Sequence, residues 1–273
     1  MKALLKGLGY FLLFEAIVFV FACLVELIPV ASIIQQVGTG GSAEAYTAAL
    51  IDWSDRHQDG IFIGSNLLVV AVFLLINRND NQFKSIATHK IDLRTVLVIV
   101  GIGILLSLAI NYIRVYIVTS GIYELSERDA RASSSTASMP IQVVRSAIIA
   151  PIVEEIVFHG TVFMRMKRGM PVALAAVLSS VCMAIAHFGG VITTVYAAIV
   201  SLVLIYIICC TSSLLTGIIA HAVYNLTCIG LEYLPFNDTL ICIIISTSCV
   251  MIAVLLVYLH KSYVRGRNPQ CPK

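Results

Sequence analysis

Apolar stretches close to the length of a membrane span recur along the whole chain. A helix needs about 20 apolar residues to cross the hydrocarbon core of a bilayer, and helices satisfy their own backbone hydrogen bonds there. Hydrophobic residues make up 59% of the 273 residues and charged residues only 12%, whereas soluble domains carry roughly 25% charge. The sequence therefore predicts an all-α, polytopic membrane helix bundle.

The apolar stretches predict eight transmembrane helices, at residues 8–34, 61–77, 95–118, 140–164, 171–188, 191–210, 213–232 and 239–259. The first is expected to be a retained span rather than a signal peptide, because its apolar run is long and contains Glu15 and Glu26. We divide this single integral membrane domain into N-terminal helices (1–139), a core (140–232), and a last helix with a basic tail (233–273).

The basic residues of the loops predict the orientation in the membrane, because Lys and Arg concentrate on the cytoplasmic side. One side receives thirteen of them: Lys2, Lys6, Arg78, Lys84, Lys90, Arg94, Arg165, Lys167, Arg168, Lys261, Arg265, Arg267 and Lys273. The other side receives Arg56, Arg128 and Arg131. Both termini are therefore predicted to be cytoplasmic. The net charge of +3 is explained by contact with an anionic lipid bilayer, and no nucleic-acid partner is expected.

Two adjacent glutamates, Glu154 and Glu155, interrupt the apolar stretch APIVEEIVFHG. An ionised carboxylate at membrane depth is costly unless it faces protein, water or a partner. One interpretation is a buried structural acid that pairs with Arg145 or with a histidine. The other is a reactive site.

Polar residues in two later stretches favour a reactive site. His187 ends the segment CMAIAHFGG, and the segment GIIAHAVYNLT places His221 and Asn225 four residues apart, on one helical face. Pro151 provides a possible kink one turn before the glutamates and would free a backbone carbonyl. Antiparallel packing brings Glu154 and His187 to a similar depth, and a tilt or kink must bring His221 to them.

These segments together resemble a known family of enzymes. EEIVFHG, MAIAH and HAVYN are similar to the motifs EExxxR, FxxxH and HxxxN of the CPBP intramembrane proteases. That Abi-like group includes the type II CAAX prenyl endopeptidases and bacteriocin-processing or self-immunity proteins. The resemblance covers about residues 140–232 and implies that Glu154, His187, His221 and Asn225 are catalytic.

Two positions depart from the family pattern. His159 stands where the family has arginine, and Met183 stands where it has phenylalanine. A histidine titrates near neutrality and makes fewer hydrogen bonds than arginine, but His159 lies four residues after Glu155 and can still pair with it. We therefore predict that Glu155 and His159 orient the site.

Peptide hydrolysis requires an activated water and groups that stabilise the oxyanion and the leaving amine. We hypothesise that Glu154 accepts a proton from a water that His187 positions, while His221 and Asn225 donate hydrogen bonds to the oxyanion. A metalloendopeptidase mechanism is the alternative, with Zn²⁺ bound by His187, His221 and Glu154. Asparagine is a poor zinc ligand, which tilts the balance toward a glutamate-activated water without metal.

The expected substrate is a membrane-anchored or hydrophobic peptide that enters a cavity opening toward the cytoplasm. The resemblance implies either a prenylated CAAX protein or a leader-type or bacteriocin peptide. The compact chain suggests a bacterial plasma membrane. Two other classes remain open, a non-catalytic immunity or partner-binding scaffold and a proton- or ion-coupled transporter. The scaffold should keep its function when Glu154 becomes glutamine, whereas the transporter should lose uptake.

Overall fold

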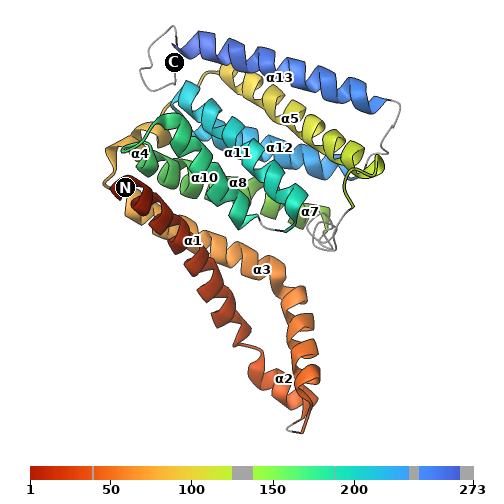
Figure 1. Ribbon diagram of the computed structural model, residues 1–273. Coiled ribbons are helices and arrows are strands. Elements are labelled where there is room, and N and C mark those ends of the chain that lie inside the picture. The colour runs from red at the N-terminus through yellow and green to blue at the C-terminus, as the bar shows by residue number, and fades with distance from the viewer. Residues whose placement is uncertain (39, 125–137, 188, 234–239, 265–273) are drawn as a thin grey trace.

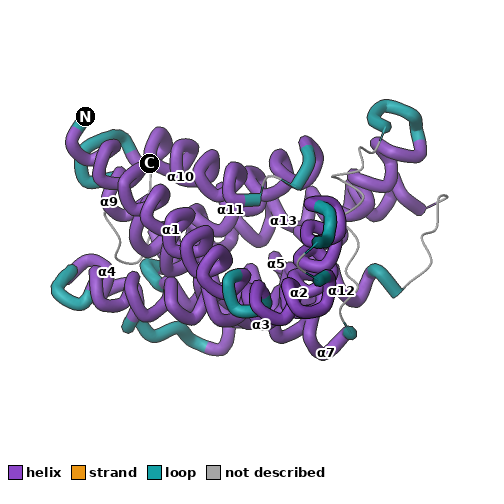
Figure 2. Tube along the Cα trace, turned by 90° about the horizontal axis from the view of Figure 1, so that it is seen from below, coloured by secondary structure: helices purple, strands orange, loops and turns teal. Residues whose placement is uncertain are grey.

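The computed structural model describes residues 1–38, 40–124, 138–187, 189–233 and 240–264, and all regular structure within them is helical (Figure 2). The elements are α1 (Lys2–Glu26), α2 (Val30–Val37), α3 (Ala43–Asn77), α4 (Asn81–Ala87), α5 (Leu93–Thr119), α7 (Met139–Gln142), η1 (Val143–Ile149), α8 (Ala150–Glu154), η2 (Glu155–Phe163), α9 (Met164–Met166), α10 (Val172–Ala186), α11 (Val191–Thr211), α12 (Leu214–Leu231) and α13 (Ile241–Val264). The predicted all-α fold is confirmed. The predicted loop around Arg128 and Arg131 and the predicted basic tail with Arg265, Arg267 and Lys273 lie outside the described residues.

Seven helices in the described part of the chain are long and apolar enough to cross a membrane. They are α1, α3, α5, the continuous helix Met139–Met166, α11, α12 and α13. These spans indicate an integral membrane protein. The stretch 171–188 was predicted to be an eighth span, but α10 has only 15 residues, fewer than the roughly 20 that a crossing needs. Which end faces the cytoplasm stays a prediction.

Two predicted boundaries were wrong. The first span was predicted to run through residue 34, but α1 ends at Glu26 and α2 begins after Pro29. Proline lacks a backbone N–H and disfavours helical geometry in the residue before it, which separates the two helices. The second span was predicted from residue 61, but α3 already begins at Ala43, where the Ser42 side chain accepts a hydrogen bond from the Ala45 N–H.

The helices lie in layers (Figure 1). α13 packs on α5, α5 packs on α12, and α12 packs on η1 of the central helix. α10 and α11 pack on each other, and α1 and α3 form the opposite edge, where they diverge toward α2. The central helix Met139–Met166 has 78% of its apolar window buried, whereas the other spans reach at most 44%. The fold therefore surrounds the helix that carries the two glutamates.

The central helix is irregular at the glutamates. π-helical turns occupy η1 and η2, on either side of the short α8 that contains Pro151. A proline inside a helix cannot donate its usual hydrogen bond, and π-turns are frequent at functional sites. In η2, Thr161 Oγ1 donates to the Ile156 carbonyl at 2.8 Å. The kink expected at Pro151 stays a prediction, and the irregularity that the structure shows is the pair of π-helical segments on either side of α8.

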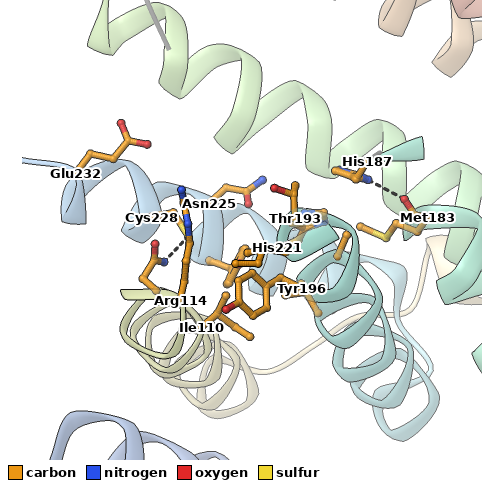
Figure 3. Close-up of a pocket in the computed structure, with 15 residues that line it drawn as sticks. Ile110, Arg114, Met183, His187, Thr193, Tyr196, His221, Asn225, Cys228 and Glu232 are labelled. Atoms are coloured by element: carbon orange, nitrogen blue, oxygen red, sulfur yellow. Dashed lines mark hydrogen bonds between the residues drawn. The ribbon is translucent and has the colours of Figure 1, made fainter. Parts of the chain in front are cut away.

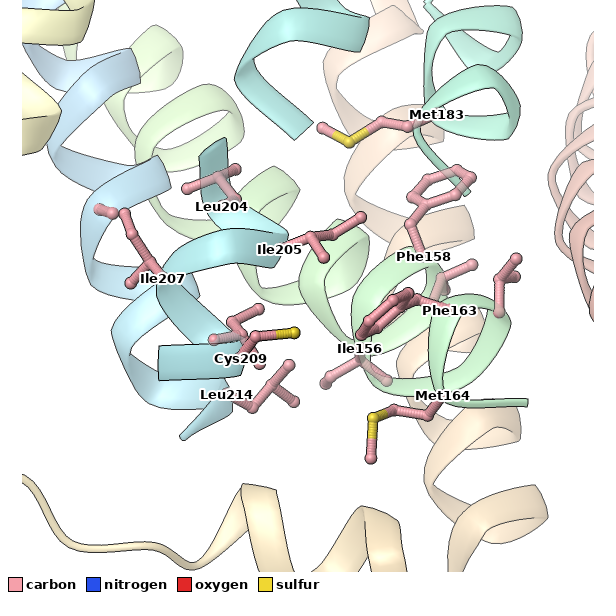
Figure 4. Close-up of a cluster of buried hydrophobic side chains, with 14 of the residues drawn as sticks. Ile156, Phe158, Phe163, Met164, Met183, Leu204, Ile205, Ile207, Cys209 and Leu214 are labelled. Carbon is pink, nitrogen blue, oxygen red and sulfur yellow. The ribbon is translucent and has the colours of Figure 1, made fainter. Parts of the chain in front are cut away.

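Apolar side chains pack around η2. Figure 4 shows Phe158 and Phe163 of η2 facing Met183 of α10 and Ile205 of α11, and all four are buried. Burying such a side chain stabilises a water-soluble protein by about 1.5–3 kcal/mol, but in lipid close packing replaces that driving force. The cluster thus holds η2, α10 and α11 in fixed register.

Asp80 ties two loops together at one end of the bundle. It caps α4 and forms ion pairs with Arg165 and Arg168, whose nitrogens lie 2.7 Å and 2.6 Å from Asp80 Oδ2. Burial of Asp80 opposes ionisation, but the Arg168 hydrogen bond, the Phe83 N–H and the charges of both arginines hold its pKa below the ordinary value. The loops 78–80 and 167–171 therefore meet at the same end.

Candidate active site

Glu155 is the centre of a buried hydrogen-bond network. It lies at the start of η2 and is completely buried, as is His159 one turn later. Glu155 Oε2 lies 2.6 Å from His159 Nδ1, and Oε1 lies 3.0 Å from His221 Nδ1. A carboxylate only accepts hydrogen bonds, so both imidazoles donate from Nδ1 when Glu155 is ionised. The predicted pairing of His159 with Glu155 is present.

The network continues into α10 and α11. His159 Nε2 lies 2.9 Å from Ser201 Oγ, and Ser180 Oγ donates to Ser201 Oγ at 2.9 Å. A neutral His159 accepts the Ser201 hydroxyl proton, so every donor in this chain points toward Glu155. Each ring nitrogen of the buried His159 therefore has a hydrogen-bond partner. Sequence reasoning missed Ser180 and Ser201, whose only signal is a hydroxyl side chain inside an apolar run.

Gly217 lets α12 approach the Glu155 carboxylate. A Cβ atom at this position would lie 2.5 Å from Glu155 Oε2 and 2.6 Å from Ile208 Cδ1. Both distances are shorter than van der Waals contact, so a side chain would displace one of these groups. Gly217 precedes His221 by one helical turn, which places the His221 ring beside Glu155. The sequence analysis had not singled out this glycine.

Glu154 has different surroundings from its neighbour. Its Oε1 lies 3.4 Å from His187 Nε2, and its Oε2 lies 3.7 Å from His221 Nε2. Oε2 is buried and has no hydrogen-bond partner among the described residues. A buried carboxylate oxygen without a partner is costly. Glu154 therefore offers an acceptor that a water molecule or a substrate can use.

The hydrogen bonds at Nδ1 of His187 and of His221 determine that Nε2 of each ring faces Glu154. His187 caps the C-terminus of α10, and its Nδ1 lies 2.8 Å from the Met183 carbonyl oxygen. That oxygen only accepts, so Nδ1 donates and Nε2 points to Glu154. His221 donates from Nδ1 to Glu155 and likewise presents Nε2. The structure thus brings Glu154, His187 and His221 together, as predicted.

His221 lies on α12, which is one α-helix from Leu214 to Leu231; the tilt or kink expected for it stays a prediction. α12 begins after Ser212, which has a left-handed φ of 53°. Ser213 Oγ donates to the His89 carbonyl at 3.1 Å. The start of α12 is therefore held against the α4–α5 loop.

Asn225 lies one turn beyond His221, on the same face of α12. Its Nδ2 donates to the Ser146 carbonyl in η1 at 2.6 Å. An amide nitrogen has two protons, so this bond orients the side chain and leaves one N–H for another acceptor. Arg145, the residue before Ser146, forms an ion pair with Asp59 and lies over the Phe62 ring. The alternative in which Arg145 neutralises the glutamates is therefore wrong.

Two cavities meet at the candidate site. The first has a volume of about 250 Å³ and lies between α5, α11 and α12 (Figure 3). His187, His221 and Asn225 line it, together with Tyr196 and Arg114. The second has a volume of about 490 Å³, lies between α1, α3 and the central helix, and ends at Glu154 and His187. His187 therefore contacts both cavities.

The zinc alternative requires three protein ligands around one point. No set of three or more His, Cys, Asp or Glu side chains within the described ranges is arranged to hold a metal ion. Glu154 approaches both histidines, but the three groups do not form such a set as placed. The residues do not fit the predicted zinc site, and we derive no catalytic step through a metal.

Residues 136–227 match the family model described as type II CAAX prenyl endopeptidase Rce1-like. The chain therefore contains a domain of this family over those residues, as the three motifs predicted, and they include all six predicted site residues. The family suggests an intramembrane peptidase. The other two comparisons found no matching curated protein and no matching solved structure.

Proposed function

We propose that this protein is an intramembrane endopeptidase that hydrolyses a peptide bond with a water molecule activated by Glu154. The surroundings of that carboxylate are the observation that carries the proposal. Its side chain lies in a candidate membrane span and is only 13% exposed, its buried Oε2 has no hydrogen-bond partner among the described residues, and two imidazole Nε2 atoms lie 3.4 Å and 3.7 Å away. Such a group is expensive to keep unless the reaction uses it.

In this mechanism Glu154 is the general base. A water molecule bound between Glu154 and His187 Nε2 can donate a proton to the carboxylate while the imidazole positions its oxygen, and an oxygen lone pair then faces the substrate carbonyl. The carboxylate takes this proton during attack and delivers it to the leaving amine. Because His187 Nδ1 is held by the Met183 carbonyl, the ring cannot turn away from this water.

His221 and Asn225 are the proposed oxyanion donors. Donation from His221 Nε2 requires a ring that carries a proton on both nitrogens, and the Glu155 carboxylate at Nδ1 fixes the orientation of that ring. Asn225, whose second N–H is not used in the bond to Ser146, lines the smaller cavity together with His221. Preorganised donors of this kind typically contribute about a hundredfold to a thousandfold to kcat. Glu155 and His159 act as positioning residues through His221.

The proposed substrates are membrane-anchored or hydrophobic peptides that reach the site from the lipid bilayer. Prenylated CAAX proteins are supported by the family description. Leader-type or bacteriocin peptides are the alternative that the motifs suggested. A bacterial plasma membrane remains our proposed location.

The test is cleavage of a library of membrane-anchored peptides by the purified protein in lipid nanodiscs, compared with the Glu154→Gln variant. Product from the wild type and none from the variant is expected. A chelator-treated sample should be equally active if water is activated by glutamate alone, whereas loss of activity that zinc restores would favour the metal alternative.

The same experiment separates the other function classes. If the folded wild type releases no product from a broad library, the hydrolase proposal is overturned. A protective function that survives in Glu154→Gln would then indicate a partner-binding scaffold. Ion or proton uptake that disappears in this variant would indicate a transporter.

A further inference from the structure

The larger cavity contains acidic groups that the proposed reaction does not use. Its volume is about 490 Å³, and it extends from Glu154 and His187 along the facing sides of α1 and α3. The α3 wall contributes polar side chains, namely Ser54, Gln58, Ser65 and Asn66. The α1 wall contributes two carboxyl groups, Glu15 and Glu26. We call this space the α1–α3 cavity.

The acidic residues of α1 all face the cavity. Glu15 and Glu26 are eleven residues apart, which is about three helical turns, so they share one face of α1. The opposite face carries Leu13, Val20 and Leu24, which are exposed on the surface of the bundle. A helix that needed only to sit in lipid would have no reason to carry two carboxyl groups on its inner face.

Apart from His187, which attracts Glu15 electrostatically, no described residue of the cavity wall places a cation against these carboxyl groups. Arg145 lines the cavity, but its guanidinium pairs with Asp59 and lies 4.7 Å from the centre of the Phe62 ring. Glu26 accepts only a long hydrogen bond, 3.4 Å, from the Ser54 hydroxyl. Glu15 Oε1 is buried and has no hydrogen-bond partner among the described residues. The cavity therefore offers carboxylate oxygens that no cation of the described residues hydrogen-bonds, beside the reacting groups.

We propose that the α1–α3 cavity binds a segment of the peptide substrate through a basic side chain, lysine or arginine, whose cation pairs with Glu15. This inference rests on the proposed peptidase function, because it names a specificity-determining residue for the same site. A cation satisfies the unpartnered carboxylate oxygen, and charge-assisted hydrogen bonds are the strong ones in a dry site. The cavity ends at Glu154, so a peptide held at Glu15 passes directly to the proposed base.

The position of Glu26 predicts where a second basic side chain would lie along the bound peptide. Eleven residues of helix separate Glu15 and Glu26 by about 16 Å, and an extended peptide advances about 3.3 Å per residue. A peptide that runs along α1 would therefore place a second basic side chain at Glu26 about five residues from the first.

The experiment uses the full-length protein in nanodiscs and fluorescein-labelled peptides that differ at one position. A scan places lysine, norleucine or glutamate at each position in turn, since norleucine retains the aliphatic chain of lysine without its charge. Binding is measured by fluorescence anisotropy, which needs no turnover, and cleavage is measured in parallel. At one position we expect lysine to bind about tenfold more tightly than norleucine, and glutamate more weakly than norleucine.

The Glu15→Gln variant should reduce the lysine preference to about one, whereas Glu44→Gln should retain it. Glu44 lies in the first turn of α3 and does not line the cavity, so it is a matched control. His187 attracts Glu15 electrostatically, and a loss of Glu15 that acted only through His187 would slow all three peptides equally. The ratio of the dissociation constants of the lysine and norleucine peptides separates a direct contact with Glu15 from an effect through His187.

Three outcomes distinguish the two proposals. Equal binding of lysine and norleucine peptides at every position, or a preference that persists in Glu15→Gln, overturns the basic subsite even if peptides are cleaved. A preference for lysine that depends on Glu15, without cleavage of any peptide, supports the subsite and overturns the peptidase. The three-peptide order in the wild type also keeps the subsite testable if Glu15→Gln does not fold.

Discussion

The central helix Met139–Met166 and the edge helix α1 are both apolar enough to cross a membrane, yet their surroundings are opposite. The central helix has 78% of its apolar window buried and α1 has 6%. Each carries carboxyl groups at membrane depth. Glu155 of the central helix receives two histidine N–H groups, whereas Glu15 of α1 has an oxygen without a partner. Apolarity alone places both helices in lipid, but packing decides which carboxylate is structural.

The same contrast exists between two adjacent residues. Glu155 is fully enclosed by α10, α11 and α12, and its donors form a continuous chain to Ser180. Glu154 instead lines the α1–α3 cavity, together with His187. A satisfied network rigidifies a site, and an unsatisfied acceptor remains available to a reactant. The pair therefore divides into a positioning carboxylate and a reactive one.

The largest expected effect is on activity, in Glu154→Gln. If Glu154 is the general base, kcat should fall by about a hundredfold to ten-thousandfold. The unfolding temperature in detergent micelles should change less than in a Glu155 variant, because Glu154 Oε2 has no hydrogen-bond partner among the described residues and the two histidines lie 3.4 Å and 3.7 Å away. Retained peptide cleavage in the folded variant would remove the distinction between the two glutamates.

Glu155→Ala should instead reduce stability together with activity. Removing one partner of a buried ionic pair costs about 3–5 kcal/mol, and this change leaves His159 and His221 without their shared acceptor. Thermal unfolding in detergent micelles measures the loss, with Glu44→Ala as the exposed control. An unfolding temperature equal to that of the wild type would show that the network is not structural.

Gly217→Ala tests the close approach of α12 to Glu155. The new methyl group would meet Glu155 Oε2 at 2.5 Å, and overpacking of this kind costs about 1–3 kcal/mol. Gly230 of the same helix has no atom within 4 Å of an added Cβ, so Gly230→Ala is the matched control. Thermal unfolding should separate the two variants. Equal unfolding temperatures would mean that the approach is not tight.

The smallest effect concerns Asp80, outside the spans. Its pKa is lower in the folded protein than its ordinary value, so its contribution is complete above the unfolded pKa of about 3.9 and is lost as the pH falls through the folded pKa. Asp80→Asn should destabilise the protein by about 1 kcal/mol at neutral pH and by progressively less below pH 4, because asparagine can still cap α4 but lacks the charge that pairs with Arg165 and Arg168.

Unfolding temperatures of wild type and Asp80→Asn between pH 3 and pH 7 provide the measurement. Asp52→Asn is the control, because the Asp52–Arg56 pair is well exposed and such pairs contribute little. A difference between wild type and Asp80→Asn that does not change with pH would contradict the titration.

Much of the site was predictable because its residues are polar in an apolar sequence. Glu154, His187 and His221 were identified in this way, and the structure places them together. Ser180, Ser201 and Gly217 were not, since a serine or glycine in an apolar helix is compatible with lipid contact as well as with a site. The contact of Asn225 with the Ser146 carbonyl also depends on helix packing that spacing does not reveal.

The membrane class, most of the spans and the polar residues of the site were predictable from the amino-acid pattern, because each depends on the transfer of side chains from water to lipid. Three features were not predictable from that pattern: α10 stops short of a full span, the central helix takes π-turns at the glutamates, and α1 turns its carboxyl groups inward. Those features depend on contacts between residues far apart in the chain, where the approach of one helix to another sets the geometry. The difference between Glu154 and Glu155, neighbours in sequence, is of this second kind.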